Sequence, residues 1–374
     1  MKKILKEKVG DILIKLSRLK KIKKSNYKIL GKFPIIDQGT NFIAGFTDDE
    51  QGLNTNLPIT LFGDHTRIMR FIKKPFVAGA DGTHCLIPNK GYDRRYFFYT
   101  LKNLKLKNYG YERHFKYLKE EFIPKHKFKN QQKIAIILSN YDDLIENNIK
   151  RIELLEKTAK LIYEEWFVKF KFPGYKDVNM SDSKLGKMPK GWKVINLEEL
   201  FKIKTGKTDA KDAVENGKYP LYDRSKIIKK SNKFLFKSKA IIIPGEGKEF
   251  NPRYYEGKFD LHQRAYAIMP KIDRKIMYFF IWIDKHKDYF GRVATGATVK
   301  SLRMNNFEKF PTMLPSEDIL IKFEELVVSI FSSISNLEQK NKNLQQTRDL
   351  LLPKLINGIV DVSNLEIVVP EVEA

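Results

Sequence analysis

Residues 131–166 read QQKIAIILSNYDDLIENNIKRIELLEKTAKLIYEEW, and their apolar side chains recur at alternating steps of four and three residues. This heptad spacing predicts a long amphipathic helix whose apolar stripe packs against another helix. A second stripe of the same kind runs from Phe323 to Leu355. Because each stripe needs an apolar partner, we expect the two helices to pack on each other.

Each stripe contains one asparagine near its middle, Asn148 in the first and Asn341 in the second. In an antiparallel pairing that sets these two amides opposite each other, each remaining stripe position of one helix also faces a stripe position of the other helix. A parallel pairing aligned on Thr158 and Thr347 sets both amides against apolar side chains, at about 1–3 kcal/mol for each unsatisfied amide. We therefore predict an antiparallel coiled coil with these opposed positions: Ile145 and Leu344, Asn148 and Asn341, Ile152 and Leu337, Leu155 and Ile334, Trp166 and Phe323.

The sequence before each long helix repeats with a period of about 185 residues. Three pairs of segments carry the repeat: 33–37 (FPIID) with 219–223 (YPLYD), 59–63 (ITLFG) with 241–245 (IIIPG), and 83–88 with 264–270. Short apolar runs between Gly, Asp and Asn turns predict strands in both copies. The predicted fold is α+β, with two similar globular domains separated by the two helices in a pseudo-two-fold internal repeat.

The ends of these patterns predict the domain boundaries. Asn130 and Ser316 are candidate N-caps of the two helices, and Pro353 should kink or end the second. We expect a first globular domain at 1–128, a spacer helix at 129–172, a linker at 173–190, a second globular domain at 191–314, a second spacer helix at 315–358 and an acidic tail at 359–374.

The composition points to a nucleic-acid partner. A net charge of +25 over 374 residues, with a pI near 9.7, favours binding of a polyanion. The only cysteine, Cys85, excludes an internal disulfide and a cysteine-based zinc cluster, and it suits the cytoplasm. The histidines show no paired metal spacing, and no apolar run approaches the roughly 18 residues that span a bilayer. We expect no metal site and no membrane contact.

Catalytic motifs are incomplete. The segment 205–208 (TGKT) resembles the end of a phosphate-binding loop, but Phe201 stands where that loop needs glycine. The segment 251–254 (NPRY) resembles the Asn-Pro-Pro-Tyr of amino-methyltransferases except at Arg253. Two Glu-Gly-Lys triplets, 246–248 and 256–258, match only half of a nuclease metal site. These residues predict no enzyme activity.

Four further segments carry a family resemblance. They are 163–174 (YEEWFVKFKFPG), Pro189 with Gly191-Trp192, 296–302 (GATVKSL) and 347–358 (TRDLLLPKLING). With the tandem repeat, they resemble the central segment, the second-half start, the G-T-x-K-x-L loop and the C-terminal signature of type I restriction–modification specificity subunits. The first domain has 110–118 (GYERHFKYL) in place of a G-T-x-K-x-L loop.

The resemblance implies a non-catalytic DNA-binding subunit whose two target-recognition domains each read half of a split site in double-stranded DNA. The helices are then the spacer and the dock for two modification subunits. S-adenosylmethionine, ATP and Mg²⁺ are expected on those subunits and on the restriction subunits, with no cofactor on this chain.

Arg and Gln side chains recognise base edges, and cationic side chains contact phosphates. In the second domain we predict contacts from Gln263, Arg264, Thr298 and Lys300 to bases and from Lys248 and Arg253 to phosphates. The corresponding candidates in the first domain are Thr83, His84, Arg113 and Lys116.

Two other classes of protein stay open. A single-chain nuclease or methyltransferase would act with Mg²⁺ or S-adenosylmethionine alone. A coiled-coil scaffold without DNA specificity would bind independently of salt and show no preference for duplex DNA.

Overall fold

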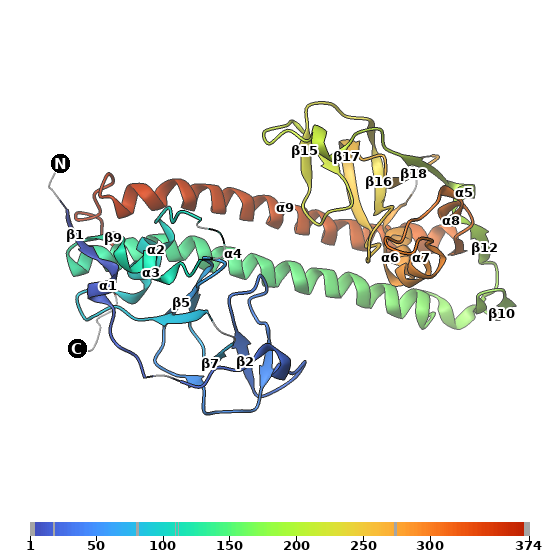
Figure 1. The fold of residues 1–374 in the computed structure, drawn as a ribbon. Coiled ribbons are helices and arrows are strands. Elements are labelled where there is room, and N and C mark those ends of the chain that lie inside the picture. Colours follow the sequence, from blue (N-terminus) through green and yellow to red (C-terminus); the bar gives the residue numbers. More distant parts are fainter. Residues whose placement is uncertain are drawn as a thin grey trace. The chain divides into compact units, whose positions relative to one another are not determined.

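The computed structural model describes residues 4–17, 19–79, 82–108, 110, 112–272 and 275–369. The chain divides into two compact units. Unit 1 comprises Met1–Ile149 with Glu338–Ala374, and unit 2 comprises Lys150–Leu337. Two long helices, α4 (Phe128–Tyr163) and α9 (Glu317–Ile356), each contribute to both units (Figure 1).

The helix ends differ in part from the expectation. Helix α4 begins at Phe128, so the prediction of Asn130 as its N-cap is wrong; the Asn130 amide instead donates to the Lys127 carbonyl. A π-helical turn, η2 (Glu164–Val168), continues α4. Ser316 directly precedes α9, and its carbonyl accepts a hydrogen bond from the Leu320 amide. Pro353 lies inside α9, which continues to Ile356.

The two helices pair antiparallel, as predicted. In unit 1, the Asn148 amide donates to the Asn341 Oδ1 at 2.8 Å, and both side chains are buried. The His126 ring nitrogen Nε2 lies 2.9 Å from the Ile356 carbonyl, so the start of α4 lies beside the end of α9. In unit 2, the ring centroids of Trp166 and Phe323 are 5.9 Å apart.

The remaining spacer positions lie along the same faces. Ile145, Ile334 and Leu337 are buried, whereas Ile152, Leu155 and Leu344 are half-buried. Their individual pairings stay predictions.

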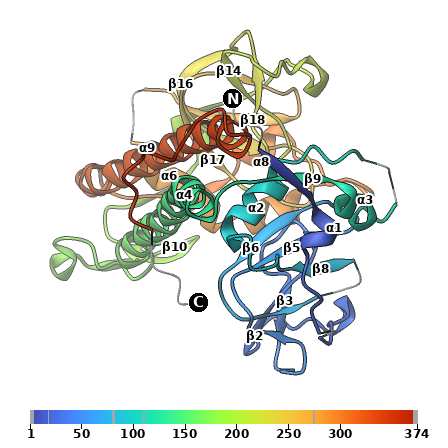
Figure 2. The ribbon, with the colours of Figure 1, turned by 90° about the vertical axis from the view of Figure 1, so that its left-hand side faces the viewer.

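The strands in the described part of unit 1 form three sheets. Figure 2 labels strands of each, among them β2 and β3, β5 and β6, and β1 and β9. Their strand orders are β3-β2-β7-β4, β6-β5-β8 and β1-β9. The elements are β1 (Leu5–Lys8), α1 (Val9–Ile12), η1 (Lys24–Asn26), β2 (Phe33–Ile36), β3 (Gly45–Thr47), β4 (Leu53–Asn54), β5 (Ile59–Gly63), β6 (Met69–Ile72), β7 (Phe76–Ala78), β8 (Thr83–Leu86), α2 (Arg94–Lys102), α3 (Phe115–Glu120) and β9 (Phe122–Lys125). Apolar side chains of α1 and α2 share a core with Leu138 of α4 and Leu355 of α9.

The globule of unit 2 is built on a six-stranded sheet, β13-β18-β16-β17-β14-β15. Two antiparallel strand pairs accompany it: β10-β11, a hairpin in the segment expected as a linker, and β12-β19, whose strands are distant in the sequence. The elements are η3 (Tyr175–Asp177), β10 (Met180–Ser183), β11 (Gly186–Pro189), β12 (Lys193–Asn196), α5 (Leu197–Leu200), β13 (Phe201–Thr205), η4 (Ala210–Asp212), β14 (Tyr219–Tyr222), β15 (Lys229–Ser231), β16 (Phe236–Pro244), β17 (Arg253–Leu261), β18 (Ala265–Pro270), α6 (Met277–Lys285), α7 (Lys287–Val293), α8 (Met304–Glu308) and β19 (Pro311–Leu314).

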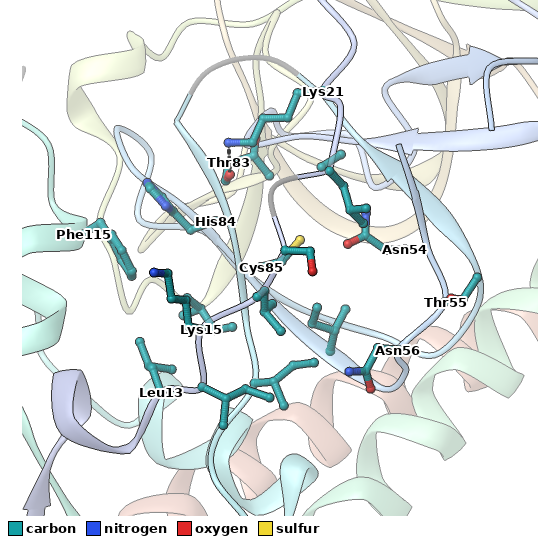
Figure 3. A pocket seen from close by; sticks show the side chains of 18 of the residues that line it. Leu13, Lys15, Lys21, Asn54, Thr55, Asn56, Thr83, His84, Cys85 and Phe115 are labelled. Atoms are coloured by element: carbon teal, nitrogen blue, oxygen red, sulfur yellow. Dashed lines mark hydrogen bonds between the residues drawn. The ribbon is translucent and has the colours of Figure 1, made fainter. Parts of the chain in front are cut away.

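The predicted repeat is present in both globules. Strand β2 runs parallel to β7, as β14 does to β17, and β5 pairs antiparallel with β8, as β16 does with β18. The copies differ at one edge. Strand β13 pairs with β18 over its whole length, whereas in unit 1 the residue directly after α1, Leu13, forms an isolated bridge with Pro88. In unit 1, a cavity of about 880 Å³ lies beside β8 (Figure 3).

Candidate nucleic-acid interface

Glu246, the residue after Gly245 at the end of β16, connects four segments of unit 2. Its carboxylate accepts hydrogen bonds from Arg224 Nη1 at 2.9 Å, from Arg264 Nη1, and from the Ser301 hydroxyl at 3.1 Å. The Glu246 side chain is only 8% exposed, whereas those of Arg224 and Arg264 are 57% and 59% exposed. One buried anion therefore positions two guanidinium groups whose outer faces remain in water.

The electrostatics favour the charged form of Glu246. Burial raises the pKa of a carboxyl group, but hydrogen bonds from Arg264 and Ser301 and the charges of Arg264 and Arg224 outweigh it, so the pKa of Glu246 is lower than usual. Each guanidinium carries five N–H donors, so bonding to Glu246 leaves several for a ligand. This pre-ordered arrangement suits bidentate recognition of a phosphate or a guanine edge.

Backbone hydrogen bonds attach the loop at 296–302 to the residues on either side of Glu246. The Gly247 amide donates to the Lys300 carbonyl at 3.0 Å, and the Leu302 amide donates to the Gly245 carbonyl at 2.8 Å. Gly296 has a φ of 125°, a backbone conformation that glycine adopts without strain. Thr298 and Lys300 are exposed on this loop, as is Lys248 beside Gly247.

The other two candidates in unit 2 have mixed positions. Gln263 is exposed, and its amide lies 3.4 Å from an Asp209 oxygen. Arg253 is half-buried, and its Nη2 donates to the Ser225 carbonyl at 2.7 Å. Part of the Arg253 guanidinium is thus used to hold the loop after β14, while a phosphate contact from this residue stays a prediction.

Asp64 occupies in unit 1 the repeat position of Glu246. It follows Gly63 at the end of β5 and is buried. Its Oδ1 accepts a hydrogen bond from the Phe115 amide at 2.7 Å, and its Oδ2 lies 3.4 Å from His84 Nε2. The ring of His84 stacks on Phe115 at a centroid distance of 4.0 Å (Figure 3). Burial lowers the pKa of His84 despite the neighbouring Asp64, so the neutral imidazole predominates at pH 7.

The remaining candidates of unit 1 surround this position. Thr83 is 1% exposed and its carbonyl accepts a hydrogen bond from Lys21 Nζ at 2.6 Å, so a base contact from its side chain would require movement of β8. Arg113 is exposed. Lys116 is also exposed and forms an ion pair with Glu112 at 2.7 Å. The segment that contains Arg113 and Lys116 packs against Asp64, just as the segment that contains Lys300 packs beside Glu246.

The structure brings only some of the candidates to a buried carboxylate: Arg264 and the segment with Lys300 lie at Glu246, and His84 lies at Asp64. Gln263 and Arg253 bind other partners. The sequence reasoning missed those carboxylates and Arg224. A usable signal existed, because Asp64 and Glu246 both directly follow the repeated Ile-x-x-x-Gly segment.

Among the described residues, no group of three or more His, Cys, Asp or Glu side chains could hold a metal ion. In the same part of the chain, no helix has the length and apolar character needed to cross a bilayer.

Comparison with known proteins gives one consistent group. Residues 189–346 match the family "Type I restriction modification DNA specificity domain". The MjaIX specificity subunit of a type I restriction enzyme from Methanocaldococcus jannaschii is 29% identical over 316 residues, which cover 76% of this chain and 73% of the relative. The EcoDI specificity subunit from Escherichia coli is 32% identical over 178 residues, covering 46% of this chain and 39% of the relative.

A solved structure has the same fold. The crystal structure of a type I restriction–modification S subunit from M. genitalium superposes with a TM-score of 0.62 at 20% identity, covering 97% of this chain and 98% of that chain.

Proposed function

Because the family model and the curated relatives agree, we propose that the chain is a specificity subunit of a type I restriction–modification system and that each of its two globular domains reads one half of a bipartite DNA site. Within such a system the specificity subunit is the non-catalytic component that recognises DNA. The observation that supports the two-reader proposal is the repeat itself. Two similar globules each place candidate DNA-contacting side chains beside one buried carboxylate, His84 beside Asp64 in unit 1, and Arg224 and Arg264 beside Glu246 in unit 2.

The charge supports DNA as the ligand. A net charge of +25 attracts duplex DNA of any sequence through phosphate contacts and release of counterions. Sequence discrimination then needs side chains that reach base edges. Arg264, Thr298 and Lys300 are exposed next to the Glu246 cluster and are the proposed base contacts of unit 2, and His84 and Arg113 are those of unit 1.

The two helices are the proposed spacer and docking surface. Helix α4 covers 36 residues and α9 covers 40, so each rises roughly 50–60 Å at 1.5 Å per residue. We propose that they fix the gap between half-sites and bind two modification subunits. Those subunits and the restriction subunits would hold S-adenosylmethionine, ATP and Mg²⁺, and we propose that the complex acts on DNA in the cytoplasm.

Salt dependence of DNA binding tests the first part of the proposal. If six to ten phosphates are neutralised, the affinity for duplex DNA should fall about 10³–10⁵-fold between 50 and 200 mM salt. A nearly flat response would argue for the scaffold class of protein instead.

A domain exchange tests the division of labour. Residues 191–314 are replaced by the matching region of a relative, and the methylome of a host that carries the system reports the recognised motif. One half-site should change and the other should stay. A change in both halves would exclude independent readers.

A further inference from the structure

Each globule has an exposed apolar pair on the corresponding loop, although the two pairs are shifted by one residue when counted from the aspartate that begins the loop. We propose that these pairs, Phe42-Ile43 in unit 1 and Ile227-Ile228 in unit 2, contact the bases of the bound DNA duplex. They lie on what we call the anchored loops, residues 37–44 between β2 and β3 and residues 223–228 between β14 and β15. The inference rests on the proposed function and adds an apolar contact to it.

A buried aspartate begins each anchored loop. Asp37 and Asp223 are 8% and 4% exposed and directly follow β2 and β14. The Asp37 Oδ1 accepts a hydrogen bond from the Gly39 amide at 2.7 Å, and the Asp223 Oδ1 accepts one from the Ser225 amide at 2.7 Å. Such a side-chain turn fixes the backbone direction of both loops in the same way.

In both copies, an arginine from a neighbouring strand donates to the carbonyl of the same residue whose amide binds the aspartate. Arg70 of β6 donates from Nη2 to the Gly39 carbonyl, and Arg253 of β17 donates from Nη2 to the Ser225 carbonyl at 2.7 Å. The two arginines come from corresponding strands, because β6 pairs with β5 and β17 pairs with β16.

A third bond ties each loop to the carboxylate site. The Gln38 Oε1 accepts a hydrogen bond from the amide of His65, the residue after Asp64, at 3.0 Å. At the same loop position in unit 2, Arg224 binds Glu246 at 2.9 Å. Each anchored loop is therefore part of the surface that carries the proposed DNA contacts.

The tips of these rigid loops carry apolar side chains into water. Phe42 and Ile43 are 55% and 44% exposed, and Ile227 and Ile228 are 77% and 48% exposed. In unit 2 the Ser225 hydroxyl also donates to the Ile227 carbonyl at 2.8 Å, which holds the tip itself. Isolated exposed apolar residues are common on proteins, but an adjacent apolar pair near the tip of the corresponding, similarly bonded loop in both copies indicates a ligand.

Charge complementarity identifies DNA as that ligand. Arg224, Lys226, Lys229 and Lys230 surround Ile227-Ile228 in the sequence, and they would meet the phosphates on either side of a groove. Apolar side chains between such cations suit thymine methyl groups at a groove floor, or a step between base pairs. The pairs would then supply sequence discrimination rather than general attraction.

The test uses the full-length chain purified with the modification subunits of its system. The double variant Ile227→Ser/Ile228→Ser is compared with the wild type on a duplex that carries the motif read from the methylome and on a scrambled duplex. Ile272→Ser is the matched control, because Ile272 is 69% exposed and lies outside the anchored loops. Thermal melting verifies that each variant is folded.

We expect the affinity of the double variant for the motif duplex to fall about ten- to hundredfold, because it loses two apolar side chains that the bound DNA would bury. Its affinity for the scrambled duplex and the slope of log affinity against log salt should match the wild type, because the phosphate contacts remain. The corresponding variant Phe42→Ser/Ile43→Ser should lose discrimination at the other half-site. Ile272→Ser should bind both duplexes like the wild type.

Three results would overturn the inference. The first is that both double variants discriminate between the two duplexes as well as the wild type does. The second is that a double variant loses the same affinity for both duplexes. The third is that a variant loses the modification subunits while its DNA binding is unchanged, which would assign the pairs to a protein contact. Failure of the wild type itself to prefer the motif duplex would instead refute the proposed function.

Discussion

The hydrogen bond between Asn148 and Asn341 should contribute to stability mainly as a pair. In Asn148→Ala the partner amide stays buried without a bond, at about 1–3 kcal/mol, and Asn341→Ala should cost a similar amount. The double variant leaves no orphaned amide, so its loss should be smaller than the two single losses together, by about 1 kcal/mol or more. The higher helix propensity of alanine contributes equally in each arm of this cycle and cancels.

The assay is urea unfolding of the four proteins, followed by the helical signal at 222 nm. Strictly additive losses would show that the two amides do not interact and would refute the buried pair. The register has an independent test in a Cys85→Ser background. Ile145→Cys with Leu344→Cys should cross-link within one chain, whereas Ile145→Cys with Ile334→Cys should not, and the reverse outcome would reject the register.

Three further predictions concern buried carboxylates and helix length. Glu246→Gln removes the charge that holds Arg224 and Arg264, so the affinity for the motif duplex should fall about tenfold, corresponding to about 1.4 kcal/mol; unchanged affinity in a binding titration would exclude an ordering role. Since the pKa of Glu246 is lowered in the folded state, its contribution to stability is present above the unfolded pKa, near 4.5, and is lost as the pH falls through the lower folded value. Burial raises the pKa of Glu324, whose oxygens accept bonds from the amides at the start of α6, so the wild type should gain stability as the pH falls through that raised value. Glu324→Gln should remove this dependence and melt at the same or a higher temperature at pH 7, and a persistent pH dependence in the variant would assign it to another group. Inserting one heptad into both long helices should move the proposed readers about 10 Å and lengthen the preferred gap by about three base pairs, and an unchanged gap in the methylome would refute the spacer role.

The helical part of the fold was predictable because its information is local and periodic. The heptad spacing and the single asparagine in each stripe were sufficient to predict the antiparallel pairing and the contact of Asn148 with Asn341. The start of α4 was mispredicted, because Asn130 fits the composition of an N-cap while the helix begins two residues earlier, at Phe128. Helix ends are defined only to within one or two residues, so the identity of a cap residue alone does not fix where a helix begins.

The candidate site was predictable only in part, because it depends on pairs that are distant in sequence. Arg264 and Lys300 were selected for their chemistry and their place in the repeat. The ion pairs of Glu246 join residues 224, 246 and 264, and no local pattern reports them. Thr83 shows the opposite failure, since its place in the repeat was matched correctly but its side chain is buried in β8.

The composition of the core of unit 1 has a consequence for synthesis of the chain. Val9 and Tyr96 share that core with Leu352, Leu355, Ile356 and Val362. The ribosome must therefore deliver residue 362 before the first globule can close, whereas all of unit 2 lies between Lys150 and Leu337 and can close earlier. A nascent chain stopped before α9 is complete would leave the globule made first without part of its interior, exposed to proteases and to aggregation.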